Sequence, residues 1–251
     1  MAAPSRRYQF GLRALLAVMA AISLPLAGWA LLRQQLARQD YLSCRSRLAH
    51  MAILLRTYHD YYDAFPPSYL VDEPGSPNHS WRTLILFGYN PRFPPPYKLN
   101  EPWDGPNNGK FTSGWKDDFV CPSAGHDWPQ PVTDYAMVVG PGAISAGETS
   151  TALEEIVDGP ENTVIVMELV DSDIGWGEPR DISLDDAVQA LTGGPQKQIA
   201  GPHRGRMLLF ADGETRRLTR PLPEATARAM LTVSGGEPIR RHELDDAGYF
   251  N

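Results

Sequence analysis

An uncharged apolar run near the N-terminus constrains this chain most. Ala14–Leu32, ALLAVMAAISLPLAGWALL, contains 19 residues without a charged side chain, and a helix needs about 20 apolar residues to cross a bilayer. Arg6, Arg7 and Arg13 precede the run, and Arg33 closes it. Arg38, Arg45 and Arg47 weaken the asymmetry, but the positive-inside rule favours a single-pass protein of the inner (cytoplasmic) membrane, with a cytoplasmic N-terminus and an extracytoplasmic head.

Two export signals compete with a permanent anchor. Pro25 followed by Gly28-Trp29-Ala30 resembles a signal-peptidase site with small residues around the cut. Ser5-Arg6-Arg7 resembles the start of a twin-arginine signal, but Tyr8-Gln9-Phe10 fits that motif poorly. We favour the intact anchor because the helical pattern continues without a break past Arg33.

A regular apolar stripe follows the anchor. Its positions alternate spacings of four and three residues, which places them on one helix face: Ala37, Tyr41, Cys44, Leu48, Met51, Leu55, Tyr58 and Tyr62. Asp63 and Pro66-Pro67 predict where this helix ends. Because Tyr, Cys and Ala make a poor coiled-coil seam, we expect the helix to pack on its own head rather than on a partner helix.

Short strands and helices separated by turns are predicted for the rest of the chain. The predicted strands are Trp81–Phe87, Tyr135–Val139, Thr163–Val170, Arg206–Ala211 and Glu214–Thr219, and the predicted helices are Ser183–Leu191 and Pro223–Leu231. Asp212-Gly213 predicts a hairpin turn in which both residues adopt positive φ, and Ser183 predicts a helix N-cap. We expect an α+β fold with a mainly antiparallel sheet packed on the stripe-bearing helix.

This layout is that of a type IV pilin-like subunit, whose long N-terminal helix is first transmembrane and then amphipathic. The expected parts are a cytoplasmic stub and transmembrane anchor (1–33), an amphipathic stalk helix (34–62), an α+β head (63–240) and a polar tail (241–251).

Blocks of sequence along residues 41–237 resemble a bacterial family named domain of unknown function 1559, abundant in planctomycetes and prepilin-like. The blocks are CRSRLAHMAILLRTYHDYYDAFPPS, SWRTLIL, EPWDGPNN, FVCPS, TDYAMVVGPGA, IVDGPENTVIVME, GWGEPRDI and TVSGGE. HRGRMLLFADG resembles the family's C-terminal signature, a His followed after nine residues by Asp-Gly. The resemblance assigns His203, Asp212 and Gly213 to that signature.

The chain departs from this family pattern in two places. Eight residues rather than nine separate His203 from Asp212. The prepilin cleavage motif, which resembles Gly-Phe-Thr-Leu-x-Glu, is replaced by RYQFGLR at 7–13, which has no Glu. The anchor is therefore divergent, and we expect neither prepilin-peptidase processing nor assembly into filaments.

The chain has two cysteines, Cys44 and Cys121. An oxidising compartment permits a disulfide between them. We favour that bridge over two buried free thiols because of the expected compartment and the even number of cysteines.

His203 and Asp212 resemble a general base and the carboxylate that orients it. Along a strand, however, the intervening residues separate their Cα atoms by about 25–30 Å. We therefore expect His203 at a strand entry and Asp212-Gly213 in a turn, with no catalytic role.

An acidic loop and five tryptophans are further candidates for binding sites. The loop offers oxygen ligands for Ca²⁺ from Asp171, Asp173, Glu178 and Asp181. It lacks an EF-hand pattern, so we expect solvated acids there and at Asp117-Asp118. The tryptophans Trp81, Trp103, Trp115, Trp128 and Trp176 are expected mainly in the core, with a glycan- or peptide-binding surface as the alternative.

Charge and motifs narrow the function classes. The net charge is −7, and since residues 1–33 carry four Arg and no acid, the remainder carries −11, which argues against nucleic-acid binding. Phosphate-binding, dinucleotide-binding, serine-elbow and zinc-spaced Cys/His motifs are missing from the sequence.

We expect no enzyme, cofactor or metal. The expected role is structural or interactive in the cell envelope, with the lipid bilayer and other envelope or pilin-like proteins as partners; the alternative is an anchored glycan- or peptide-binding module.

Overall fold

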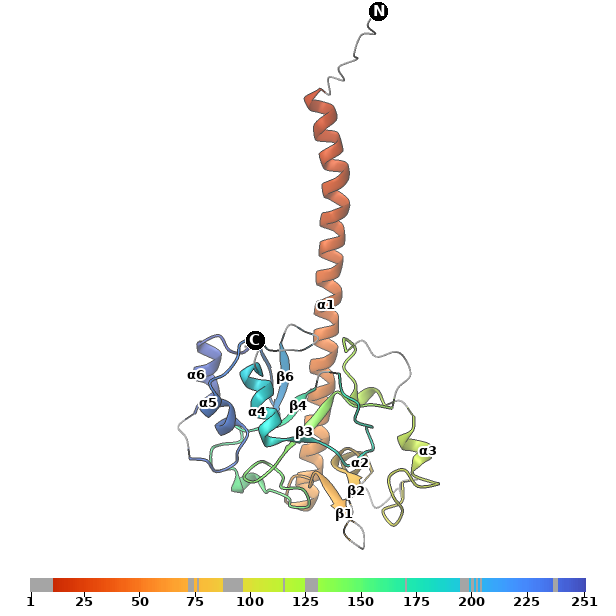
Figure 1. Ribbon diagram of the computed structural model, residues 1–251, viewed down its shortest axis with the longest axis vertical. Helices are drawn as coiled ribbons and strands as arrows, with labels where there is room; N and C mark the ends of the chain where they lie inside the picture. Colours follow the sequence, from red (N-terminus) through yellow and green to blue (C-terminus); the bar gives the residue numbers. More distant parts are fainter. Residues whose placement is uncertain are drawn as a thin grey trace, which may run out of the picture. The chain divides into compact units, whose positions relative to one another are not determined.

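The computed structural model describes residues 11–71, 75, 77–87, 97–114, 116–124, 131–169, 171–194, 199, 201, 203, 205–236 and 239–251 (Figure 1). The chain divides into two compact units, residues 1–42 and residues 43–251.

Helix α1 (Leu12–Tyr62) contains the whole predicted anchor and the whole predicted stalk. All residues from 11 to 39 are exposed, and the helix is long and apolar enough to cross a bilayer. It ends before Asp63, whose positive φ of 57° breaks the helical path, in agreement with the predicted stop.

The predicted apolar stripe is confirmed over the part of α1 that belongs to the second unit. The stripe positions between Cys44 and Tyr58 are buried there: Cys44, Leu48, Met51, Leu55 and Tyr58. Outside that stretch, Ala37 and Tyr62 are exposed and Tyr41 is half-buried. The stalk helix therefore packs on its own head, as its composition predicts.

A five-stranded sheet forms the centre of the second unit. Its strands are β3 (Tyr135–Val139), β4 (Val164–Glu168), β5 (Ile182–Ser183), β6 (Arg206–Phe210) and β7 (Thr215–Leu218), in the order β5-β3-β4-β6-β7. All neighbouring pairs are antiparallel except β3 and β5, which are parallel. The predicted α+β class with a mainly antiparallel sheet is confirmed.

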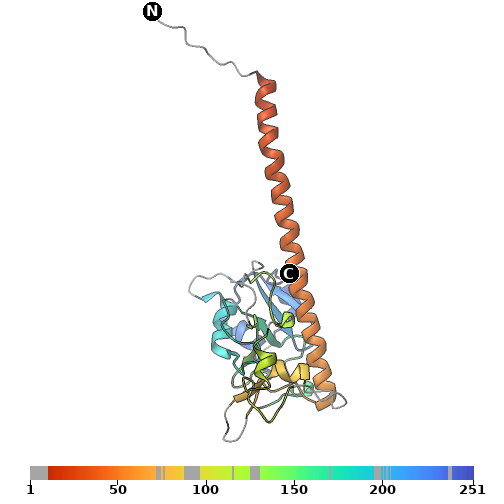
Figure 2. The ribbon, with the colours of Figure 1, turned by 90° about the vertical axis from the view of Figure 1, so that its right-hand side faces the viewer.

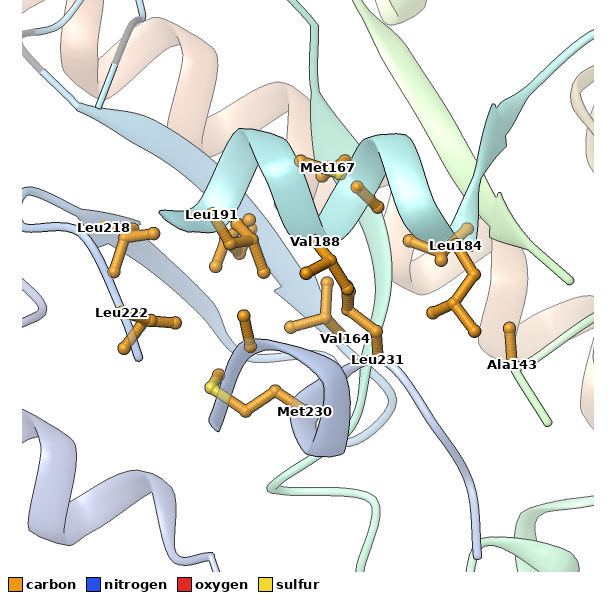
Figure 3. Packing of buried hydrophobic residues seen from close by; sticks show 14 of the residues in the cluster. Ala143, Val164, Met167, Leu184, Val188, Leu191, Leu218, Leu222, Met230 and Leu231 are labelled. Carbon is orange, nitrogen blue, oxygen red and sulfur yellow. The ribbon is translucent and has the colours of Figure 1, made fainter. Parts of the chain in front are cut away.

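Helices cover the sheet on both sides. Helices α4 (Leu184–Thr192) and α5 (Glu224–Met230) pack their apolar side chains on one face, in a cluster that includes Val164, Leu184, Val188, Leu191 and Met230 (Figure 3). The second-unit part of α1 lies along the other side (Figure 2). Ser183 caps α4 by accepting a hydrogen bond from the Asp186 backbone N–H at 3.1 Å, which confirms the predicted N-cap.

Strands β6 and β7 form the predicted hairpin, but its turn differs from the expected one. Only Gly213 has positive φ, at 88°. Its N–H donates to the carbonyl of Phe210 at 2.9 Å, and Asp212 Oδ1 accepts from the Glu214 N–H at 2.9 Å. The aspartate thus holds the turn through its side chain rather than through a left-handed backbone.

The segment Trp81–Phe87 was predicted as a strand and is the helix α2. It follows a small hairpin of β1 (Tyr69–Val71) and β2 (Pro77–Ser80). Five successive residues, Trp81 to Ile85, are buried. A short segment buried on all sides has no periodicity that separates helix from strand, which explains the wrong prediction.

Short helices complete the described structure: α3 (Gly109–Thr112), the 3-10 helices η1 (Asp117–Phe119) and η2 (Leu153–Glu155), and α6 (Arg241–Asp246). The C-terminal residues fold back on the sheet. Phe250 forms an antiparallel bridge with Leu218, and the Arg217 N–H donates to the carbonyl of Asn251 at 3.1 Å.

Candidate functional site

A disulfide joins Cys44 of α1 to Cys121, which follows η1, with 5.4 Å between their Cα atoms. Both cysteines are buried. Asp134 orients the loop by accepting a hydrogen bond from the Cys121 N–H at 2.7 Å, and the Arg47 guanidinium donates to the carbonyl of Val120. The favoured pairing of the two cysteines is therefore the one that the structure has.

His203 lies against this disulfide, just before β6. Its Nε2 atom is 3.1 Å from Cys121 Sγ and 3.9 Å from Oε1 of Glu168. The backbone carbonyl of His203 accepts a hydrogen bond from the Arg217 guanidinium at 3.2 Å. His203 is thus buried between a sulfur atom and a carboxyl group. The sequence predicts its position at the entry of a strand but not these two neighbours.

Glu168 closes β4 and is fully buried. Its Oε2 atom accepts a hydrogen bond from the Met207 N–H at 3.2 Å, and its backbone carbonyl accepts one from the Arg206 guanidinium. Burial raises the pKa of the Glu168 carboxyl to about 7, an effect that the Met207 N–H and the charge of Arg206 partly oppose. Glu168 is therefore a group that gains or loses its proton near neutral pH.

These residues form one group, here named the buried cluster: Cys44, Cys121, Glu168 and His203. Their sulfur, nitrogen and oxygen atoms all lie within 4.8 Å of one another. The sequence pattern points to the cysteine pair and to His203 but not to Glu168. The sequence does contain a signal for Glu168, because its carboxylate ends the apolar run VIVME. A Glu in such a run is almost never buried unless it has a partner.

Burial limits the chemistry open to the disulfide. Reactive cysteines occupy electropositive, partly exposed positions, whereas Cys44 and Cys121 have exposed fractions of 0% and 1%. A macromolecular substrate has no access to these sulfur atoms. In the oxidised protein the disulfide therefore links the helix to the head, and the histidine and carboxyl group lie beside it.

Replacing Glu168 with Gln is expected to remove a pH dependence from the stability of the disulfide-bonded protein. With a folded pKa of about 7 against an ordinary value of 4.5, the folded state retains a proton that the unfolded state loses. The free energy of unfolding is therefore about 3 kcal/mol higher below pH 4.5, where both states are protonated, than above pH 7. This difference is lost as pH rises from 4.5 to about 7.

Urea unfolding of both proteins on either side of this pH range measures the difference. The variant is expected to gain stability relative to the native chain as pH rises. The exposed Glu243→Gln substitution on α6 is the matched control. An equal pH dependence for Glu168→Gln and the native chain would contradict the assignment.

The other two signature residues lie in the hairpin turn and not in the buried cluster. Asp212 pairs with Arg241 at 2.7 Å, and Gly213 supplies the positive φ of the turn. His203 and Asp212 have separate partners, as the sequence spacing predicts.

The acidic loop is built from ion pairs. Arg180 binds Asp173 at 2.9 Å and Glu178 at 2.7 Å, and Asp171 is exposed. The expectation of a solvated acid is wrong for Asp181, whose side chain is 3% exposed and pairs with the buried Arg82 at 2.6 Å. The sequence places Asp181 beside a loop, but the packing of α2 encloses it.

Asp118, which was also expected to be solvated, is half-buried. Its Oδ1 lies 3.1 Å from Nδ1 of His50, and its Oδ2 pairs with Lys116 at 3.2 Å.

Of the three head tryptophans within the described residues, two are core residues. Trp81 and Trp176 are buried, in contact with Phe119, whose ring centroid is 6.2 Å and 5.7 Å from theirs. Trp103 is half-buried. Trp115 and Trp128 lie outside the described residues.

Comparisons with protein-family models, curated proteins and solved structures find no match to this chain.

Proposed function

We propose that the chain is a single-pass protein of the inner membrane whose head lies on the extracytoplasmic side. The observation that carries the proposal is the uncovered apolar stretch of α1. Ala14–Leu32 has no charged residue, and no part of the described chain buries it. In water such an apolar surface would drive aggregation, whereas the hydrocarbon core of a bilayer removes it from water.

The disulfide supports the orientation. Stable disulfides belong to oxidising compartments, and the Cys44–Cys121 bridge lies C-terminal to the anchor. The arginines before the anchor favour the cytoplasmic side for the N-terminus. The two features agree on one topology although they depend on different chemistry.

The proposed role is structural or interactive, in the manner of the pilin-like family that the sequence blocks resemble. The head would meet other envelope proteins, and the chain would stay anchored because the prepilin cleavage motif is replaced. This proposal is supported by the general layout of the chain, because a long N-terminal helix packs its second half on a mainly antiparallel sheet.

Membrane fractionation of the full chain tests the anchor. We expect the native protein to remain in membranes washed with alkaline carbonate. Ile22→Asp combined with Leu26→Asp puts two charges within the span, each costing about 2.5–3.5 kcal/mol of insertion free energy, and should release protein into the soluble fraction. Ile22→Leu with Leu26→Ile is the matched control and should stay in the membrane.

Protease treatment and mass measurement test orientation and processing. Added protease is expected to digest the head in spheroplasts but not in intact cells. The mass of the membrane-extracted protein is expected to include the anchor. A soluble native chain, or a mature N-terminus after Ala30, would overturn the proposal.

A further inference from the structure

We propose that, once the disulfide is reduced, the buried cluster binds one Zn²⁺ ion through Cys44, Cys121, His203 and Glu168. Thiolate sulfur, imidazole nitrogen and carboxylate oxygen are the ligands that zinc takes in proteins. The proposal concerns the head alone and does not depend on membrane anchoring, so the two can fail separately.

The distances in the cluster suit tetrahedral coordination. Ligand atoms around a tetrahedral zinc ion lie about 3.3–3.8 Å apart, given bond lengths of about 2.0–2.3 Å. Nε2 of His203 is 3.1 Å from the Cys121 sulfur and 3.9 Å from Oε1 of Glu168, and all four ligand atoms lie within 4.8 Å of one another. The two sulfur atoms are covalently bonded in the oxidised chain, so they reach this spacing only after reduction, whereas the His203 and Glu168 atoms need small side-chain shifts.

An unsatisfied carboxylate oxygen points to a ligand independently of this spacing. Oε1 of Glu168 is buried and has no hydrogen-bond partner among the described residues. The Met207 N–H engages Oε2, which leaves Oε1 beside His203. A buried acceptor without a partner costs about 1–3 kcal/mol, and coordination to a cation would satisfy it.

The charges also balance around a divalent cation. Two thiolates, Glu168 and the buried Asp134, which accepts a hydrogen bond from the Cys121 N–H, carry four negative charges. The buried Arg206 next to Glu168 and the half-buried Arg47, which donates to the loop of Cys121, contribute two positive charges. Zn²⁺ brings the total to zero, which a buried site requires. Sulfur ligands select zinc over the hard cations Mg²⁺ and Ca²⁺.

The disulfide and the zinc site are mutually exclusive because both use the same sulfur atoms. A dithiol reductant breaks the S–S bond, supplies two electrons and becomes a disulfide itself, leaving two protein thiols. Zn²⁺ then displaces the thiol protons, and the Glu168 proton where it is present, to solvent. Reoxidation by a disulfide oxidant would release the ion.

Zinc titration of the full chain in detergent, with a chromophoric chelator as competitor, tests the proposal. We expect one Zn²⁺ per reduced chain and none per oxidised chain. Co²⁺ in the reduced chain is expected to show thiolate charge-transfer absorption and the intense visible bands of a tetrahedral site. Reduced chains should unfold at a higher temperature with Zn²⁺ than without it, even if reduction alone loosens the head.

Ligand variants identify the two ligands that are not cysteines. His203→Ala and Glu168→Gln are each expected to weaken zinc binding by at least about 10-fold. Even the loss of an outer-shell partner costs about 10- to 100-fold in metal affinity, and the loss of a direct ligand should cost at least as much. The exposed His242→Ala and Glu243→Gln substitutions on α6 are the matched controls and should bind as the native chain does.

Three results would overturn the proposal. They are no zinc binding by the reduced chain, equal binding by Cys44→Ser with Cys121→Ser, and unchanged affinity in His203→Ala or Glu168→Gln.

Discussion

Replacing Cys44 and Cys121 together with Ala is expected to lower the free energy of unfolding of the head by about 4.5 kcal/mol. The bridge closes a loop with a sequence separation of 77 residues, and the chain-entropy relation assigns that value to a loop of this length. Without the bridge the unfolded chain can adopt conformations that the disulfide-bonded unfolded chain cannot. The loss is a large part of the 5–15 kcal/mol that stabilises a typical domain.

Urea unfolding of the full chain in detergent, followed by tryptophan fluorescence, measures this loss. The buried Trp81 and Trp176 report on the core of the head. The native chain kept reduced without added metal should show a similar loss, which separates the bond from the side-chain replacement. A loss under about 1 kcal/mol in both samples would mean that the loop is held mainly by other contacts, such as the Asp134 hydrogen bond to Cys121.

Asp181→Ala is expected to destabilise the head by about 3–5 kcal/mol. Oδ1 of Asp181 accepts hydrogen bonds from Trp81 Nε1 at 3.0 Å, from Arg82 Nη2 at 2.6 Å and from the Met137 N–H at 2.9 Å. It therefore joins α2 to strand β3. Its removal leaves the guanidinium of Arg82, whose side chain is 0% exposed, without its counter-charge in the core.

Asp173→Ala is the matched control, because Asp173 forms an exposed ion pair with Arg180 in the same loop. Exposed pairs contribute about 0–1 kcal/mol. The double variant Arg82→Met with Asp181→Ala should lose less stability than the sum of the two single variants, since no unpaired charge remains. Equal effects of Asp181→Ala and Asp173→Ala would contradict this account of the core.

Further hydrogen bonds of the buried Arg82 help to hold α2 in place. Arg82 also donates to three backbone carbonyls, those of Tyr135, Glu178 and Arg180, at 3.2–3.3 Å. Each bond compensates part of the desolvation of the guanidinium. A helix of this length is not stable alone, so these tertiary contacts decide its conformation.

Local patterns in the sequence are enough to predict several elements of this fold. Uncharged length identifies a helix long and apolar enough to cross a bilayer, the alternating spacing identifies the buried face of α1 from Cys44 to Tyr58, and Ser183 identifies the start of α4. Strands β3, β4 and β6 follow from apolar runs between turns, and β7 follows from the Asp212-Gly213 turn before it. These features depend on neighbours within a few residues, where periodicity and capping act.

Contacts between residues far apart in the sequence follow from the packing of the fold and from no local pattern. Cys121 and His203 are 82 positions apart, Arg82 and Asp181 are 99 apart, and no local pattern links either pair. Trp81–Phe87 is a helix because tertiary contacts such as those of Arg82 decide its conformation. Its burial on all sides leaves no periodicity from which a helix could be told from a strand. The buried cluster arises because β4, the entry to β6, α1 and the loop after η1 converge, which is a property of the packed sheet and helix rather than of any one segment.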